Sequence, residues 1–179
     1  MSHSVFPDNT VLCNFAAVGR LDLLEVVLLG RGRWTEAVAY EVERSSHFLS
    51  GLSAVAQGGW LGDPIEVTKA ADARQVERIR RAVFGGGEDE PLRHLGEAQT
   101  CHVLARWPEF AGSWWVSDDR EALRYARHQG LVTRETVDLV SIAAVNGEIT
   151  AEAGHSLLLQ MEGLERALRV PTSVRDLLA

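Results

Sequence analysis

Carboxylate side chains recur where short apolar segments end, and this arrangement constrains the fold more than any other feature of the chain. Asp8 follows the apolar run 4–7, and the pair Asp118 and Asp119 follows the run 112–117. A carboxylate that comes just after a buried strand lies at the carboxyl end of a parallel sheet, where α/β folds place their sites. Converging carboxylates repel one another unless a cation neutralises them. The pattern therefore predicts a site for a hard divalent metal ion and metal-assisted phosphate chemistry.

Two further acidic positions lie in segments with helical spacing. Glu41 is inside the segment 37–42, and Glu97 follows Gly96 at the start of another helical segment. A glutamate on a helix more often belongs to a solvated face. The assignment of these two glutamates to a site therefore rests on their occurring together with the aspartates that follow the strands. We include both in the predicted acidic site.

The composition is typical of one compact globular domain. A chain of 179 residues is long enough to bury a sizeable core. No segment is long and apolar enough to cross a bilayer, and the first residues lack a signal-peptide pattern. We therefore expect a cytoplasmic location and no membrane partner.

Charge and cysteine usage narrow the class of protein further. The formal net charge of -7 argues against a protein that is held on nucleic acid by bulk positive charge. It does not exclude a nuclease, because part of that charge would belong to the metal site. Cys13 and Cys101 form no C-x-x-C pair, which argues against structural zinc. We expect two reduced core thiols, and a disulfide stays open as the alternative.

Helical and strand-like segments alternate along the chain. Strands are predicted over 4–8, 60–61, 65–68, 113–117 and 131–132, and helices over 9–18, 21–29, 35–42, 70–84, 91–107, 119–129, 133–145 and 150–168. This alternation predicts an α/β three-layer sandwich, with a mostly parallel central sheet flanked by helices. We assign residues 1–179 to a single domain in which 150–179 form a C-terminal helical extension.

The order of these motifs resembles the PIN-domain family of metal-dependent ribonucleases. The nearest resemblance is to small prokaryotic members related to the toxins of toxin–antitoxin pairs. It covers about residues 4–165 and rests on the segments 8–12 with 18–24, 37–42, 96–99 and 117–126. Two positions depart from the family pattern. Gln99 stands where an acidic residue often follows, and Glu97 stands where many members have aspartate.

The resemblance implies hydrolysis of single-stranded RNA with Mg²⁺ or Mn²⁺. Asp8, Glu97 and Asp119 would hold the ion directly or through water, with Asp118 close by. Which of the two neighbouring aspartates is the ligand stays open. Glu41 would complete the acidic ring and orient the attacking water. A bound metal lowers the pKa of its water and polarises the phosphate.

Residues around the acidic ring receive supporting roles by the same resemblance. Asn9, Asn14 and Ser117 would fix the carboxylate rotamers. Independently of the resemblance, Arg120 and Arg124 lie on one face of the helix after the aspartate pair and close to the proposed metal, so we predict that they bind phosphate. The implied partners are an RNA substrate and an antitoxin protein, and a homodimer is an expected oligomeric state.

Two alternatives follow from the same residues. Asp8 and Asp118 could each serve only as the N-cap of the following helix, since aspartate is a preferred capping residue. The departures at Glu97 and Gln99 also favour a PIN-like binding or interaction module without catalysis. We keep that module as the alternative function.

Overall fold

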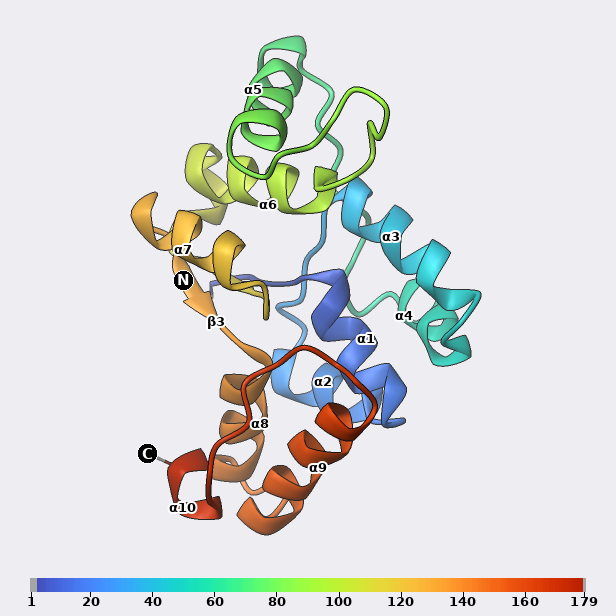
Figure 1. Cartoon of the computed structure of the whole chain (residues 1–179), viewed down its shortest axis with the longest axis vertical. Helices are drawn as coiled ribbons and strands as arrows, with labels where there is room; N and C mark the ends of the chain where they lie inside the picture. Colours follow the sequence, from blue (N-terminus) through green and yellow to red (C-terminus); the bar gives the residue numbers. More distant parts are fainter. Residues whose placement is uncertain (1–2, 179) are drawn as a thin grey trace.

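A small parallel sheet lies at the centre of the protein and helices surround it (Figure 1), as seen in a computed structural model that describes residues 3–178. Strands β1 (Val5–Pro7), β2 (Trp114–Val116) and β3 (Val132–Arg134) pair in parallel in the order β1-β2-β3. The helices are α1 (Asn9–Ala17), α2 (Leu21–Leu28), α3 (Glu36–Ser46), η1 (Ser50–Leu52), α4 (Ser53–Gly58), α5 (Ala70–Ala82), α6 (Leu95–Arg106), η2 (Pro108–Phe110), α7 (Arg120–His128), α8 (Thr136–Val145), α9 (Ala151–Gly163) and α10 (Val174–Leu177). The predicted α/β architecture with a parallel sheet is confirmed.

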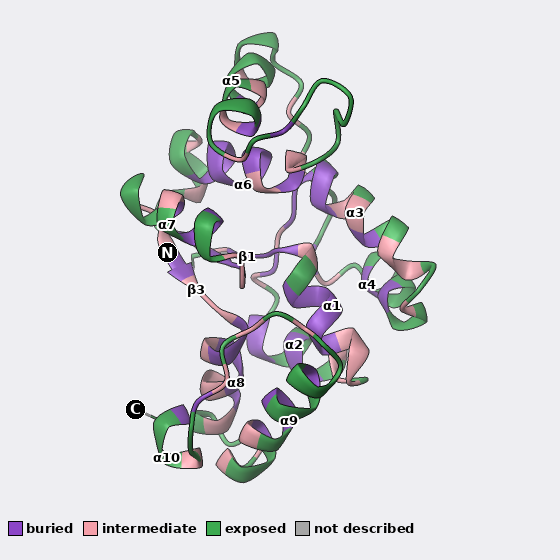
Figure 2. Ribbon diagram, viewed as in Figure 1, coloured by how far each residue is buried: buried purple, intermediate pink, exposed green. Residues whose placement is uncertain are grey.

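The two faces of the sheet belong to two different hydrophobic cores. Val5 and Val116 pack into the core formed with α1, α2, α8 and α9. Phe6 and Trp115, the next positions on the same strands, pack with α6 and α7. Successive side chains of a strand point to opposite faces, so strands of three residues each can serve both cores. Figure 2 shows the buried residues along the inner sides of these helices, and the layering is that of a sandwich.

Side-chain caps explain where several helices begin. Thr35 Oγ1 accepts a hydrogen bond from the Val38 amide and starts α3, as its sequence predicted. Thr150 caps α9 in the same way. At α8 a capping box joins Glu135 and Asp138. These caps satisfy amides that the first turn of a helix leaves unpaired.

Two predicted strand segments are wrong. Residues 60–61 form a turn, and within 65–68 only Ile65 pairs, in an isolated bridge to Thr35. Both segments lie beside Asp63 and Pro64, and a proline donates no hydrogen bond to a sheet. The chain there crosses the surface as a connection, so the sheet gains no further strand.

Three predicted helix boundaries are also wrong. The helix expected from Pro91 begins at Leu95, because His94 has a φ of 61°, outside the right-handed helical region. The last strand extends to Arg134, so the helix expected from residue 133 begins only at Thr136. The helix expected to reach Leu168 stops at Gly163, two residues before Glu165 takes a φ of 58°.

The C-terminal helices share the larger core. α9 packs on α8 and on α1, and α10 packs on α9. Leu158, Met161 and Leu177 are buried in the same cluster as Val5 of the sheet. Within residues 3–178, no helix is long and apolar enough to span a membrane.

Candidate functional site

Asp8 lies at the carboxyl end of β1 and begins α1. Its amide donates to the Val116 carbonyl at 2.9 Å, which ties it to the end of β2. Its carboxylate accepts hydrogen bonds from the Asn9 amide at 2.7 Å, from Thr10 Oγ1 at 3.1 Å and from Ser117 Oγ at 3.1 Å. The residue is only 4% exposed. Asp8 is therefore a helix N-cap and, at the same time, a buried acid at the sheet edge.

Glu41 of α3 and Glu97 of α6 lie close enough to Asp8 to act on its charge. Burial, with repulsion from Glu97, raises the pKa of Asp8 to about 7 against opposing hydrogen bonds. Burial, then repulsion from Asp8 and Glu97, raises the pKa of Glu41 to about 8. The structure thus places three of the predicted acids, from three different elements, within range of one another's charge. Because a bound cation would stabilise the ionised form of these carboxylates, their raised pKa values favour a positively charged ligand.

Asp118 lies past the end of β2, and hydrogen bonds engage both of its oxygens. Oδ1 accepts from the Thr136 amide at 2.9 Å. Oδ2 accepts from Asn14 Nδ2 at 2.8 Å and from the Thr136 hydroxyl. Burial raises the pKa of Asp118, and these hydrogen bonds oppose the rise. Asp118 therefore joins β2, α1 and α8, a role that the sequence prediction of an N-cap did not include.

Asp119, not Asp118, caps α7. Its Oδ1 accepts from the amides of Glu121 at 2.8 Å and Ala122 at 3.0 Å. Its Oδ2 has no hydrogen-bond partner among the residues that the structure describes. Ser117 Oγ accepts from the Asp119 amide at 3.2 Å and donates to Asp8, so the aspartate pair and Asp8 share one edge of the sheet.

The predicted supporting residues divide into two groups. Asn14 and Ser117 contact site carboxylates, as described above. The Asn9 side chain instead donates to Ser45 Oγ at 3.1 Å, and so links α1 to α3. Arg124 forms an exposed ion pair with Glu121 on its own helix. For Arg124 and for Arg120 on the same helix, phosphate binding stays a prediction.

Gln99, which stands where an acidic residue is common in the family pattern, forms two hydrogen bonds that a carboxylate could not both form. Its Oε1 accepts from the Ala37 amide at 3.1 Å, and its Nε2 donates to Glu36 Oε1 at 2.9 Å. An amide side chain can both donate and accept, whereas a carboxylate can only accept. Gln99 therefore clamps α6 to the first turn of α3. That clamp helps to fix the helices that carry Glu41 and Glu97.

The glycine before Glu97 leaves room for the acidic centre. A Cβ atom at Gly96 would lie 2.9 Å from Glu41 Oε1, closer than ordinary contact distance. α3 and α6 can therefore approach closely where their glutamates meet.

Comparison with known proteins identifies the family of the chain. A family model described as a PIN domain matches residues 4–176. The chain belongs to the PIN-domain family. No curated protein and no solved structure matches it. PIN domains are in general hydrolytic nucleases that bind nucleic acids and typically use divalent metal ions, and this chain has the corresponding parallel sheet with acids at its carboxyl edge.

The acids of this PIN domain fit a divalent cation in their chemistry, without forming a closed cage. Carboxylate oxygens are the ligands that Mg²⁺ prefers, and the raised pKa values of Asp8 and Glu41 are what a cation would relieve. Across residues 3–178, however, no group of three or more His, Cys, Asp or Glu side chains is disposed to hold a metal ion. Mg²⁺ usually keeps several waters and needs only one or two carboxylates, so direct ligation by two acids suffices.

Sequence reasoning missed two residues near the site. Thr136 holds Asp118 through its amide and its hydroxyl. Arg166, beyond the end of α9, donates from Nε to Asn14 Oδ1 at 3.0 Å. Asn14 thus links an arginine of the C-terminal segment to Asp118 of the sheet edge. No spacing rule joins residues 152 positions apart, so only the folded chain reveals this contact.

Proposed function

We propose that this PIN domain is a metal-dependent endoribonuclease that hydrolyses phosphodiester bonds of single-stranded RNA. The observation that carries the proposal is that burial, together with repulsion among Asp8, Glu41 and Glu97, raises the pKa of Asp8 to about 7 and that of Glu41 to about 8. Folding concentrates these acids at the carboxyl edge of the sheet at a cost in free energy. Such an arrangement lowers the stability of the metal-free fold and favours the binding of a cation.

Each acid has a role that follows from its surroundings. Asp8 and Glu97 would hold Mg²⁺ or Mn²⁺, with Asp119 contributing the oxygen that no described residue occupies. When bound, the ion would polarise the scissile phosphate and lower the pKa of a water molecule. Glu41, with its pKa near 8, is suited to accept a proton from the attacking water near neutral pH. Asp118 would position this edge, since both of its oxygens are engaged.

A cleavage assay with matched variants tests the proposal. The full chain should cut a fluorescent single-stranded RNA with Mn²⁺ or Mg²⁺ and should not cut it in EDTA. Asp8→Asn and Glu97→Gln should lose more than about 100-fold in rate, equal to about 2.7 kcal/mol of transition-state stabilisation. Glu25→Gln, an exposed acid on α2, is the control and should cleave like the wild type. Unchanged cleavage by Asp8→Asn would refute the assignment.

A binding module without catalysis is the second candidate. The observation in its favour is that the described residues offer no ready set of three metal ligands. Calorimetry distinguishes the two candidates without any RNA. Heat of Mn²⁺ binding at millimolar concentration, abolished by Asp8→Asn, supports the nuclease, and its absence supports the module.

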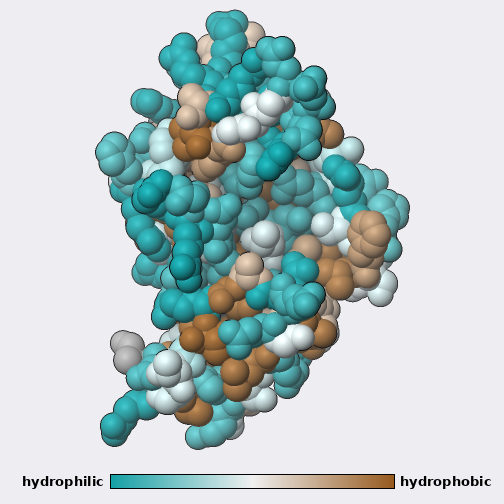
Figure 3. Space-filling view, viewed as in Figure 1, coloured by the Kyte–Doolittle hydropathy of each residue, from teal (hydrophilic) through white to brown (hydrophobic). Residues whose placement is uncertain are grey.

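We also infer a toxin role, with an antitoxin protein as partner and a cytoplasmic location. A small DNA-binding antitoxin encoded next to this chain would support the pairing. A homodimer is part of the same proposal, and exposed apolar side chains such as Leu159 and Leu164 give it a candidate surface. Figure 3 shows apolar side chains gathered over α8 and α9, while the visible face over α5 and α6 is mostly hydrophilic. Light scattering would determine the oligomeric state.

A further inference from the structure

A cavity of about 490 Å³ lies beside the acidic centre and opens on Glu41 and Glu97. Tyr40 and Arg44 of α3 line one side of it, and Leu92, Arg93 and His94 line the other. A neighbouring hollow of about 320 Å³ shares Tyr40, Glu41 and Leu92 with it. The volume of the first cavity is in the range of pockets that bind small molecules. Two of the acids discussed above therefore lie at the edge of a space of this size.

The α3 side of the cavity offers an aromatic face and a cation. Tyr40 is 44% exposed, and Arg44 lies one helical turn further on, on the same face. Arg44 forms no ion pair with any residue of the described chain, whereas Arg93 across the cavity pairs with Glu90. Burial raises the pKa of Glu41 and the charge of Arg44 opposes that rise, but no ion pair occupies the Arg44 guanidinium among the described residues, so the guanidinium can also bind an anion from outside. A half-exposed tyrosine ring beside it presents a face on which a flat base can stack.

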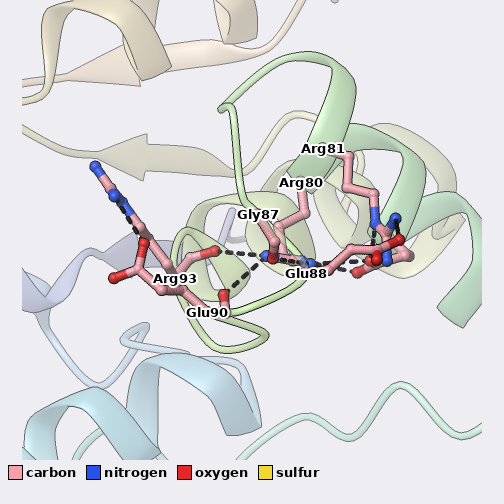
Figure 4. Close-up of polar contacts among 7 residues, drawn as sticks. Arg80, Arg81, Gly87, Glu88, Glu90 and Arg93 are labelled. Atoms are coloured by element: carbon pink, nitrogen blue, oxygen red, sulfur yellow. Dashed lines mark hydrogen bonds and ion pairs between the residues drawn. The ribbon is translucent and has the colours of Figure 1, made fainter.

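The opposite wall lacks regular structure, but a buried arginine fixes it. Arg80 of α5 is 1% exposed and donates to the carbonyls of Gly87 at 3.1 Å, Glu90 at 3.0 Å and Arg93 at 3.3 Å. Glu77 neutralises its guanidinium. Figure 4 shows these contacts gathering the loop around one side chain. The segment that carries Leu92 to His94 is thus held in place before any ligand arrives, which lowers the entropy cost of binding.

We propose that this cavity is the subsite for a nucleotide next to the scissile phosphate. Its base stacks on Tyr40 and its phosphate meets the guanidinium of Arg44. Glu41 and Glu97 repel a phosphate that carries no cation, so in the absence of metal the phosphate is held by Arg44. The inference rests on the proposed nuclease function, and it assigns the side chains that hold one nucleotide of the RNA strand.

Fluorescence anisotropy with a short single-stranded oligoribonucleotide in EDTA tests the subsite apart from catalysis. Tyr40→Ala should weaken binding by about 5- to 100-fold, because base–aromatic stacking has that range. Tyr40→Phe keeps the ring and should bind like the wild type. Phe48→Ala is the matched control, since Phe48 is 89% exposed and lies outside the cavity. Arg44→Met should weaken binding. It should also reduce the slope of the logarithm of the binding constant against the logarithm of the salt concentration by about 1.

Each outcome separates the subsite from the nuclease function. If the wild type cleaves RNA and Tyr40→Ala binds and cleaves like it, the subsite is overturned and the nuclease stands. If the wild type does not cleave but its RNA binding depends on Tyr40, the subsite stands and the nuclease fails. Loss of binding in Tyr40→Phe or in Phe48→Ala would overturn stacking at this position. Absence of RNA binding by the wild type would overturn the subsite as well.

Discussion

Replacing Asp8 by asparagine should stabilise the metal-free protein at high pH and leave it unchanged at low pH. Asparagine keeps the helix cap, because its Oδ1 can accept from the Asn9 amide as Asp8 Oδ1 does. The hydroxyls of Thr10 and Ser117, which now donate to Asp8 Oδ2, can rotate to accept from an amide nitrogen. The substitution therefore removes a buried charge with little loss of hydrogen bonding.

The sign follows from the direction of the pKa shift. Asp8 has a pKa of about 7 in the folded protein against 3.8 in the unfolded chain. Below 3.8 both states hold the proton, and the group contributes nothing. As the pH rises, the unfolded chain ionises first, so the folded state loses about 1.4 kcal/mol per pH unit up to the folded pKa. Burial and repulsion raise the pKa of Glu41 to about 8 in the same direction, and this extends the loss to higher pH.

The magnitude at about pH 8 is large enough to measure. Full conversion of the Asp8 shift gives about 4 kcal/mol, and relaxation of an ionised, hydrated site reduces it, so we expect roughly 2 to 4 kcal/mol. For a protein of this size that gain raises the Tm by roughly 5 to 15 °C. Millimolar Mn²⁺ should raise the Tm of the wild type at about pH 8 and leave that of Asp8→Asn unchanged. Only the wild type keeps the Asp8 carboxylate that would bind the ion.

Differential scanning calorimetry in EDTA from about pH 4.5 to pH 8.5 is the assay. Asp22→Asn is the control. Partial burial opposes the shift there, but the hydrogen bond from Arg20 holds the pKa of Asp22 below its usual value. That variant should gain no stability at high pH. The reasoning is wrong if Asp8→Asn shows the same Tm difference from wild type at pH 4.5 and pH 8, or if it is less stable at both.

Three further predictions follow from other contacts. Arg80→Met leaves three loop carbonyls without their donor and should lower the free energy of unfolding by roughly 1 to 3 kcal/mol, measured by urea denaturation. Arg166→Ala removes a hydrogen-bond partner of Asn14, so Mn²⁺ affinity in calorimetry should fall by about 10-fold while the fold is kept. Burial raises the pKa of Cys13, and that of Cys101 to about 12, so a thiol-specific dye should label neither in the native protein and both in urea.

The short apolar strands were visible in the sequence because each carries its own pattern. Residues 113–117 are apolar and aromatic and are bounded by Gly112 and Asp118, and this strand was found close to its true limits. The segments 60–61 and 65–68 have similar composition but form no strand. A segment becomes a strand only where the fold places another strand beside it. Strand propensity alone therefore could not distinguish 113–117 from 60–61 and 65–68.

Helix ends were harder to predict where the backbone leaves the helical region without a glycine. His94 and Glu165 both have positive φ angles, a conformation that few residues other than glycine adopt. Neither histidine nor glutamate is a residue type from which a positive φ angle is predicted. At His94 the following helix begins four residues later than predicted, and at Glu165 the preceding helix stops early.

The sequence by itself determined the family, the parallel α/β architecture and the acids at the sheet edge, because strand, cap and motif patterns are local and survive without coordinates. Only the tertiary structure decided which acids meet. Glu41 and Glu97 converge on Asp8 because α3 packs against α6, while Asp118 turns to Thr136 and Asn14. Whether a carboxylate is repelled by another acid or satisfied by a donor depends on distances between residues far apart in the chain, and packing alone sets those distances.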